Sequence, residues 1–113
     1  MSNLQQVRFS MLELASLRQD ESGPGPALQR AMQTARHVEA LGFERFWVAE
    51  HHNMDAVASS ATAVFMGFIA ANTQHIRVGS GGIMLPNHAP LMVAEQIGTL
   101  AALYPDRIDL GLG

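Results

Sequence analysis

The chain has 113 residues, of which 48% are apolar and 15% charged, and its formal net charge is −3. This mildly acidic balance excludes a basic surface for nucleic acid, and the lack of cysteine excludes disulfides and thiolate zinc sites. The longest apolar run, residues 61–71, is too short to span a bilayer, and the N-terminus lacks the pattern of a signal peptide. We therefore expect a cytoplasmic globular protein that binds neither membranes nor nucleic acid.

The first half of the chain alternates strand-like and helix-like segments. Residues 7–15 are apolar with imperfect alternation, which predicts a first strand. A turn-rich loop over residues 20–26 leads into a predicted helix that stops at Gly42. Residues 45–49 form an aromatic and β-branched run, which predicts a second strand. The apolar stripe of the helix consists of Leu28, Ala31, Ala35, Val38 and Leu41.

The second half repeats this alternation. Residues 61–71 are apolar almost all round, which predicts a helix buried on more than one side. A third strand is predicted over residues 76–79, a third helix from Pro90 onward, and a fourth strand over residues 107–112. Connections of crossover length between successive strands predict parallel pairing, with helices packed on the sheet.

Two α/β architectures fit this order of elements. One is a small open α/β domain, but the first strand is followed by neither GxGxxG nor GxxxxGK[ST], the usual phosphate-binding sequences. The other is a (β/α)8 barrel, which needs about 250 residues when complete. We predict the second: a partial TIM (β/α)8 barrel with its first four parallel strands and three helices, formed by residues 1–113 as one N-terminal portion.

A polar cluster follows the second predicted strand. It consists of Glu50, His51, His52 and Asn53. Active sites of α/β proteins lie at the carboxyl ends of strands, and imidazole titrates near neutrality, so His51 is a candidate acid/base. A capping or buried structural histidine is the alternative. A metal site is not predicted, because adjacent strand residues diverge, HExxH is absent, and His75 and His88 lack paired ligand spacing.

Three segments resemble the bacterial-luciferase-like flavin monooxygenases. They are AEHHN at residues 49–53, VGSGGIMLPNHAPLMVAEQ at 78–96 and YPDRIDLGLG at 104–113. The resemblance implies that the chain is the N-terminal third of a TIM barrel. It also implies an enzyme that uses reduced FMN, supplied by a separate flavin reductase, and O2 to oxidise a small organic substrate. The 113-residue chain is expected to be inactive alone.

The same resemblance implies roles for individual residues. His51 matches the family's catalytic histidine beside the flavin ring, where it acts as an acid/base or hydrogen-bond partner. Glu50 either orients His51 or bonds near the flavin, and a salt-bridging role is equally compatible. In the luciferase pattern the second histidine, here His52, pairs across a subunit interface with the residue that matches Glu95.

The glycine-rich segment after the third strand is the second part of the implied cofactor site. Ser80, Gly81 and Gly82 stand where the family has a non-prolyl cis peptide against the flavin, and the matching bond is Gly81–Gly82. A simple glycine turn or bulge is the alternative. Gly113 matches a small residue at the barrel mouth. The arginine that helps to bind the flavin phosphate in the family would come next, so weak FMN binding is expected.

Two other interpretations stay open. The chain could be a non-catalytic remnant that acts only through self-association. It could also be a deazaflavin-dependent reductase of the same superfamily, although the EHHN and NHAP sequences fit the FMN branch better. The small residues of segment 61–71 suit core packing and also the family's dimerisation through its second and third helices, so a homo-oligomer is expected.

Overall fold

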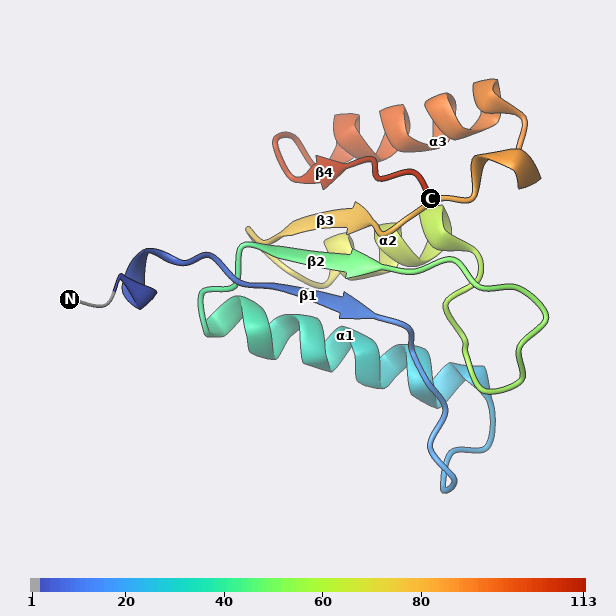
Figure 1. The fold of residues 1–113 in the computed structure, drawn as a ribbon, viewed down its shortest axis with the longest axis horizontal. Coiled ribbons are helices and arrows are strands. Elements are labelled where there is room, and N and C mark those ends of the chain that lie inside the picture. Colours follow the sequence, from blue (N-terminus) through green and yellow to red (C-terminus); the bar gives the residue numbers. More distant parts are fainter. Residues whose placement is uncertain (1–2) are drawn as a thin grey trace.

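The computed structural model describes residues 3–113, so Met1 and Ser2, which belong to the segment tested for a signal peptide, lie outside it. Strands and helices alternate along the chain (Figure 1). They are β1 (Ser10–Glu13), α1 (Pro24–Ala40), β2 (Arg45–Val48), α2 (Thr62–Ala71), β3 (Arg77–Ser80), α3 (Pro90–Leu103) and β4 (Ile108–Asp109). Two short 3-10 helices, Leu4–Gln6 and Leu85–Asn87, complete the structure. No helix within residues 3–113 is long and apolar enough to cross a membrane.

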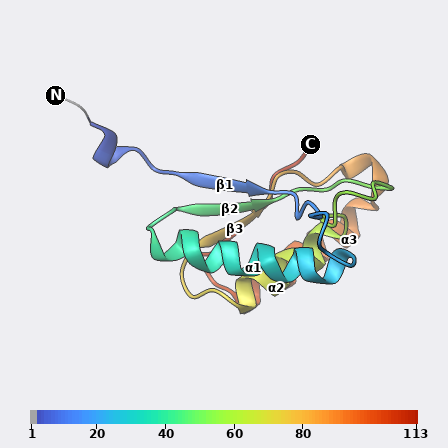
Figure 2. The ribbon, with the colours of Figure 1, turned by 90° about the horizontal axis from the view of Figure 1, so that it is seen from below.

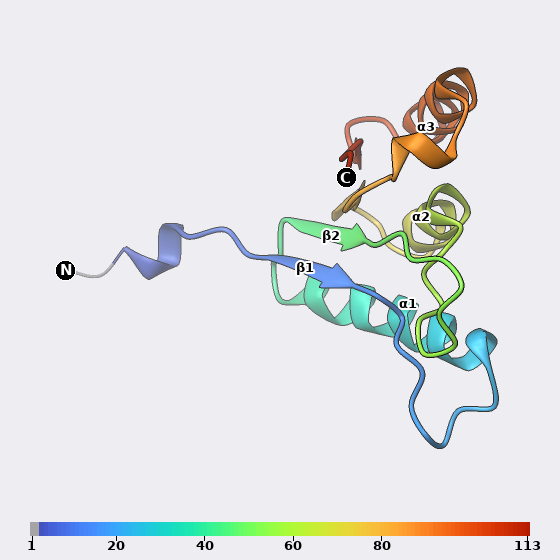
Figure 3. The same cartoon turned by 45° about the vertical axis from the view of Figure 1, so that its right-hand side comes forward.

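The four strands form one parallel sheet in the order β1-β2-β3-β4. All three helices lie along one side of this sheet (Figures 2 and 3), and the other side is open. A doubly wound sheet would carry helices on both faces, so this single layer is the arrangement of the first half of a (β/α)8 barrel. The predicted fold class and strand order are confirmed.

The core lies between the sheet and the helices. Phe46 and Val48 of β2 are fully buried there, together with Met66 and Ile69 of α2. Because side chains alternate along a strand, Trp47 instead lies on the open face of the sheet. This alternation gives the sheet a helix-facing side that is apolar and an open side that is free to form a site.

Both edge strands are shorter than the sequence predicts. β1 pairs only from Ser10, opposite Arg45, to Glu13, opposite Val48, and two residues later Ala15 leaves the extended conformation with a φ of 51°. At the other edge the ladder between β3 and β4 stops early. There the Ser80 hydroxyl donates to the Gly111 carbonyl (2.8 Å) and accepts from the Gly111 N–H (2.9 Å). The side chain thus takes over the bonds that a longer strand would make.

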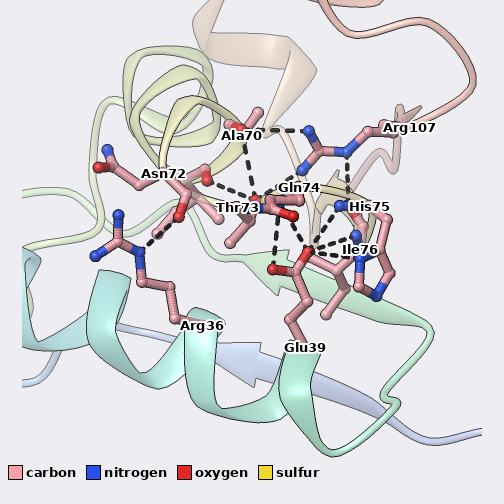
Figure 4. Close-up of polar contacts among 10 residues, drawn as sticks. Arg36, Glu39, Ala70, Asn72, Thr73, Gln74, His75, Ile76 and Arg107 are labelled. Atoms are coloured by element: carbon pink, nitrogen blue, oxygen red, sulfur yellow. Dashed lines mark hydrogen bonds and ion pairs between the residues drawn. The ribbon is translucent and has the colours of Figure 1, made fainter.

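A polar network ties together the opposite end of the sheet, where the strands begin (Figure 4). The Glu39 carboxylate at the end of α1 accepts hydrogen bonds from the backbone N–H groups of Gln74, His75 and Ile76, at 2.8–2.9 Å to Oε2. Burial alone would raise the pKa of Glu39, but these N–H groups lower it overall. Arg107 bonds the Ile76 carbonyl from the other side. This end of the sheet is held by structural contacts and leaves the carboxyl ends of the strands for the site.

Candidate active site

The candidate site begins where β2 and β3 end side by side. The Gly81 N–H donates to the Val48 carbonyl at 2.8 Å, which joins the segment after β3 to the last residue of β2. The Gly81–Gly82 peptide bond is cis, as the resemblance implies. Both glycines are partly exposed. The backbone after β3 is therefore accessible at the carboxyl end of the sheet.

A depression of about 350 Å³ lies on the open face beside these glycines. It is lined by Leu12, Trp47, Ser80, Gly81, Gly82, Gly111 and Leu112. A Cβ at Gly81 would lie 3.1 Å from the Trp47 Cβ and 3.3 Å from the Leu12 Cδ1, so a side chain would crowd the space between them. A Cβ at Gly82 would lie 2.8 Å from the backbone carbon of Leu112. Both positions therefore need glycine for close packing, and the Gly81–Gly82 segment lines the depression without a side chain of its own.

Glu50 links the loop after β2 to the segment before α3. Its carboxylate is buried and lies 2.7 Å from Nε2 of His52 and 2.9 Å from Nε2 of His88. A carboxylate only accepts hydrogen bonds, so both rings donate to it. Burial raises the pKa of Glu50, but the bonds from His52 and His88 outweigh burial and lower it overall. Glu50 is therefore charged at neutral pH, and we call the cluster that it forms with His52 and His88 the Glu50 hub.

His51 takes no part in this hub. Its backbone N–H donates to the Ser59 carbonyl at 3.0 Å, which fixes the chain where it leaves β2. Its ring is partly buried, and Nδ1 is buried without a hydrogen-bond partner in the described part of the chain. Buried polar atoms are normally paired, so this unpaired nitrogen distinguishes His51 from His52. Residues 3–113 cover Nδ1, so a ligand reaches it only if the ring turns.

The sequence of residues 7–113 matches the profile of the luciferase-like monooxygenases. The chain belongs to this family. It is 52% identical over 107 residues to a luciferase-like monooxygenase of Escherichia coli strain K12. It is 45% identical over 107 residues to the N-acetyl-S-alkylcysteine monooxygenase of Bacillus subtilis strain 168. Each match covers 95% of this chain and 32% of the relative, so the chain spans about a third of these curated relatives.

Solved structures have the same arrangement. Apo-MsnO8 gives a TM-score of 0.91 at 48% identity, over 95% of this chain and 32% of that one. The oxygenating constituent of 3,6-diketocamphane monooxygenase from Pseudomonas putida, in complex with FMN, gives 0.81 at 18% identity, over 94% and 29%. The coenzyme F420-dependent tetrahydromethanopterin reductase of Methanopyrus kandleri gives 0.74 at 22% identity, over 95% and 27%. The last two likenesses show the fold alone.

The residues that the resemblance assigns to the site do not all contact one another in the structure. Glu50 hydrogen-bonds His52 and His88 rather than His51. His52 therefore has a partner in its own chain, while Glu95 is exposed on α3. No group of three or more potential metal ligands occurs within residues 3–113. His88 is the residue that sequence analysis missed as part of the hub. Its one clue was that Glu50 and His88 both follow the ends of neighbouring parallel strands.

Ser80 and Gly113, the other residues predicted to bind the cofactor, form hydrogen bonds next to the glycine segment. Ser80 is fully buried, and its hydroxyl is occupied by Gly111. Gly113 donates its N–H to the Ile83 carbonyl at 2.9 Å and so lies beside the backbone that follows Gly82. Direct contact of either residue with a flavin stays a prediction.

Proposed function

We propose that this chain forms part of the active site of a flavin-dependent monooxygenase that uses reduced FMN and O2 to oxidise a small organic substrate. Family membership supports the monooxygenase chemistry, and the resemblance of the EHHN and NHAP sequences to the FMN branch supports the flavin. The observation that carries the proposal is the glycine-lined depression beside the end of β2. There a flat ring can approach the backbone without meeting a side chain at Gly81 or Gly82.

Each part of the proposed site has a distinct task. Gly81 and Gly82 would lie against the flavin ring, and reduced FMN, when bound, supplies the electrons that activate O2. His51 would hold or move a proton at its imidazole, a task suited to this side chain near neutral pH. Glu50 positions the loop that carries His51 by bonding His52 within it and His88 beyond it.

The chain spans about a third of its relatives. For the whole protein we propose a small organic substrate and reduced flavin that a separate reductase supplies. The lining of the depression contains no cationic side chain that could pair with the flavin phosphate. Charged contacts of that kind are the strong ones in phosphate recognition. We therefore expect the chain alone to bind FMN weakly and to be inactive.

Equilibrium dialysis against FMN tests this proposal with a matched pair of variants. Gly81→Ala places a methyl group in the depression, whereas Gly98→Ala on α3 adds the same methyl group where no atom lies within 4 Å. We expect weak FMN binding by the original chain and by Gly98→Ala, and weaker binding by Gly81→Ala, with circular dichroism confirming that all three are folded. Tighter binding of coenzyme F420 than of FMN would contradict the proposal in favour of a deazaflavin reductase. Equal FMN binding by both variants would contradict the placement of the ring.

A further inference from the structure

The indole of Trp47 lies against Gly79 of the neighbouring strand, on the open face of the sheet. Trp47 of β2 pairs with Gly79 of β3. A Cβ at Gly79 would lie 2.5 Å from Cζ3 and 2.6 Å from Cε3 of the indole, and a Cβ at Gly111 would lie 3.5 Å from Cζ3. Any side chain at Gly79 would therefore displace the ring. Glycine at this position gives the indole its place.

Three charged side chains link this ring to β4 at the edge of the sheet. Arg45 precedes Trp47 by two residues on the same face, and its guanidinium carbon lies 5.1 Å from the centroid of the indole ring. The Asp109 carboxylate of β4 accepts a hydrogen bond from Arg45 Nε at 2.7 Å, and two from Arg77 at 2.9 Å. All three side chains are only 24–33% exposed. Asp109 thus fixes a guanidinium that in turn lies over Trp47.

The anchored indole borders the depression at its lower end. Trp47 is level with Gly79, two residues before Gly81 along the strand direction, and it lines the same depression as Gly81 and Gly82. A ring that lies against the two glycines therefore has the indole at its edge, on the side toward the start of the strands. Contact between aromatic rings is favourable, and it depends on the orientation of both rings.

We propose that Trp47 is a binding residue that contacts the edge of the flavin ring, and that Asp109, acting through Arg45, is the residue that positions it. This inference rests on the proposed function for the presence of a flavin. It adds Trp47, Arg45 and Asp109, which lie outside the His51 and glycine segments, and it assigns a purpose to the charged cluster on the open face.

Trp47 is the one tryptophan of the chain, so a single indole N–H cross-peak in a ¹H–¹⁵N correlation spectrum reports on it alone. The test variant is Asp109→Asn, and the matched control is Asp106→Asn, which also removes a carboxylate near Arg77. Asparagine tolerates the φ of 61° at residue 106. We expect Asp109→Asn to move the indole cross-peak and to increase fluorescence quenching by acrylamide, whereas Asp106→Asn leaves both unchanged. Asp109→Glu should restore part of the original signal.

Millimolar FMN is then added to each protein. In the original chain we expect the indole cross-peak to shift together with the Gly81 and Gly82 amides. Asp109→Asn should weaken the apparent affinity about two- to fivefold, because an indole that is no longer held in place must be ordered when FMN binds. If Asp109→Asn fails to fold, Arg45→Met breaks the same link while Asp109 keeps its bonds to Arg77.

The outcomes separate this inference from the proposed function. Movement of the glycine amides without the indole would overturn the binding role of Trp47 and leave the proposed flavin site unchanged. An indole that is indifferent to both Asp109→Asn and Arg45→Met would overturn the positioning role. If FMN moves neither the glycines nor the indole, the flavin placement fails, and this inference fails with it.

Discussion

At the residue scale, the candidate site contains two histidines of opposite character in adjacent positions. His52 is paired with a buried carboxylate, whereas His51 has a buried ring nitrogen with no partner in the described part of the chain. The buried polar atoms of a structural residue normally have hydrogen-bond partners, whereas those of a ligand-binding residue can lack one until the ligand binds. The two positions can therefore be separated by their effects on stability.

Glu50→Gln should destabilise the chain at neutral pH by about 1–3 kcal/mol, because it removes the charge to which two imidazoles donate. The pKa of Glu50 is lowered in the fold, so its contribution is present above the ordinary value of 4.5 and is lost as the pH falls through the folded pKa. Urea unfolding at a series of pH values should show the gap between the two proteins closing in acid. Glu44→Gln, which removes an exposed ion pair with Arg8, should cost less than about 1 kcal/mol. A gap that widens in acid would contradict this assignment.

His51→Phe should leave stability unchanged within about 1 kcal/mol, or increase it, because it replaces an unpaired buried nitrogen with apolar atoms. The same variant should weaken any response of neighbouring amides to FMN. Thermal unfolding and the FMN titration measure the two effects separately. A loss of more than about 2 kcal/mol would mean that His51 has the structural role that sequence analysis left open.

The motif residues around His51 were predictable from the sequence, but their pairing was not. Glu50, His51 and His52 follow an apolar run, which placed them at a strand end. The contact between Glu50 and His88 spans 38 residues, and no local pattern encodes it. Sequence analysis set His88 aside because it lacked the spacing of a metal ligand, a criterion that does not apply to a hydrogen bond from one imidazole to a carboxylate.

At the scale of elements, prediction was accurate where burial sets the boundary and less accurate at the edges of the sheet. β2 and β3 were predicted to within one residue because both are paired on two sides. α1 ends at Ala40, and Gly42 follows with a φ of 86°, as its stop signal predicted. β1 and β4 each have one neighbour, so an apolar run there continues beyond the ladder that it forms. The exchange of bonds between Ser80 and Gly111 is a tertiary contact that the pattern of residues 107–112 does not contain.

Ser80→Ala should loosen the end of β4. The substitution leaves the Gly111 N–H without its acceptor, whereas the Gly111 carbonyl keeps the bond from the Ile83 N–H (2.9 Å), at an expected cost of about 1–3 kcal/mol. Hydrogen exchange at the Gly111 amide should accelerate more than exchange in β2. Ser10→Ala on β1, where the side chain is exposed, is the control and should change neither quantity. Unchanged protection at Gly111 would mean that the hydroxyl bonds contribute nothing to this edge.

At the scale of the whole molecule, one side of the sheet and both of its edges are uncovered (Figure 3). Parallel sheets are normally covered on both faces, and unpaired edges favour pairing with other chains. Several large apolar side chains are also at least half exposed, on the open face and on the outer sides of α2 and α3. They are Leu12, Leu112, Val64, Leu91, Met92 and Leu103. The molecule thus offers two separate apolar surfaces to a partner.

We expect the 113-residue chain to self-associate in solution rather than remain a monomer of 12.2 kDa. An ordinary stable interface buries about 800 Å² on each partner, and either apolar surface can provide residues for one. Size-exclusion chromatography with light scattering gives the mass, and two substitutions locate the contact. Leu12→Lys charges the open face of the sheet, where the side chain is 54% exposed, and Leu91→Lys charges α3, where it is 69% exposed.

If copies pair through α2 and α3, as the resemblance implies, only Leu91→Lys lowers the mass, and His52 and Glu95 of two copies become candidates for contact. If they cover each other's open faces, only Leu12→Lys does so, and FMN should then compete with association because its proposed depression lies on that face. A folded monomer at all concentrations would show that the uncovered edges and apolar side chains are tolerated in water.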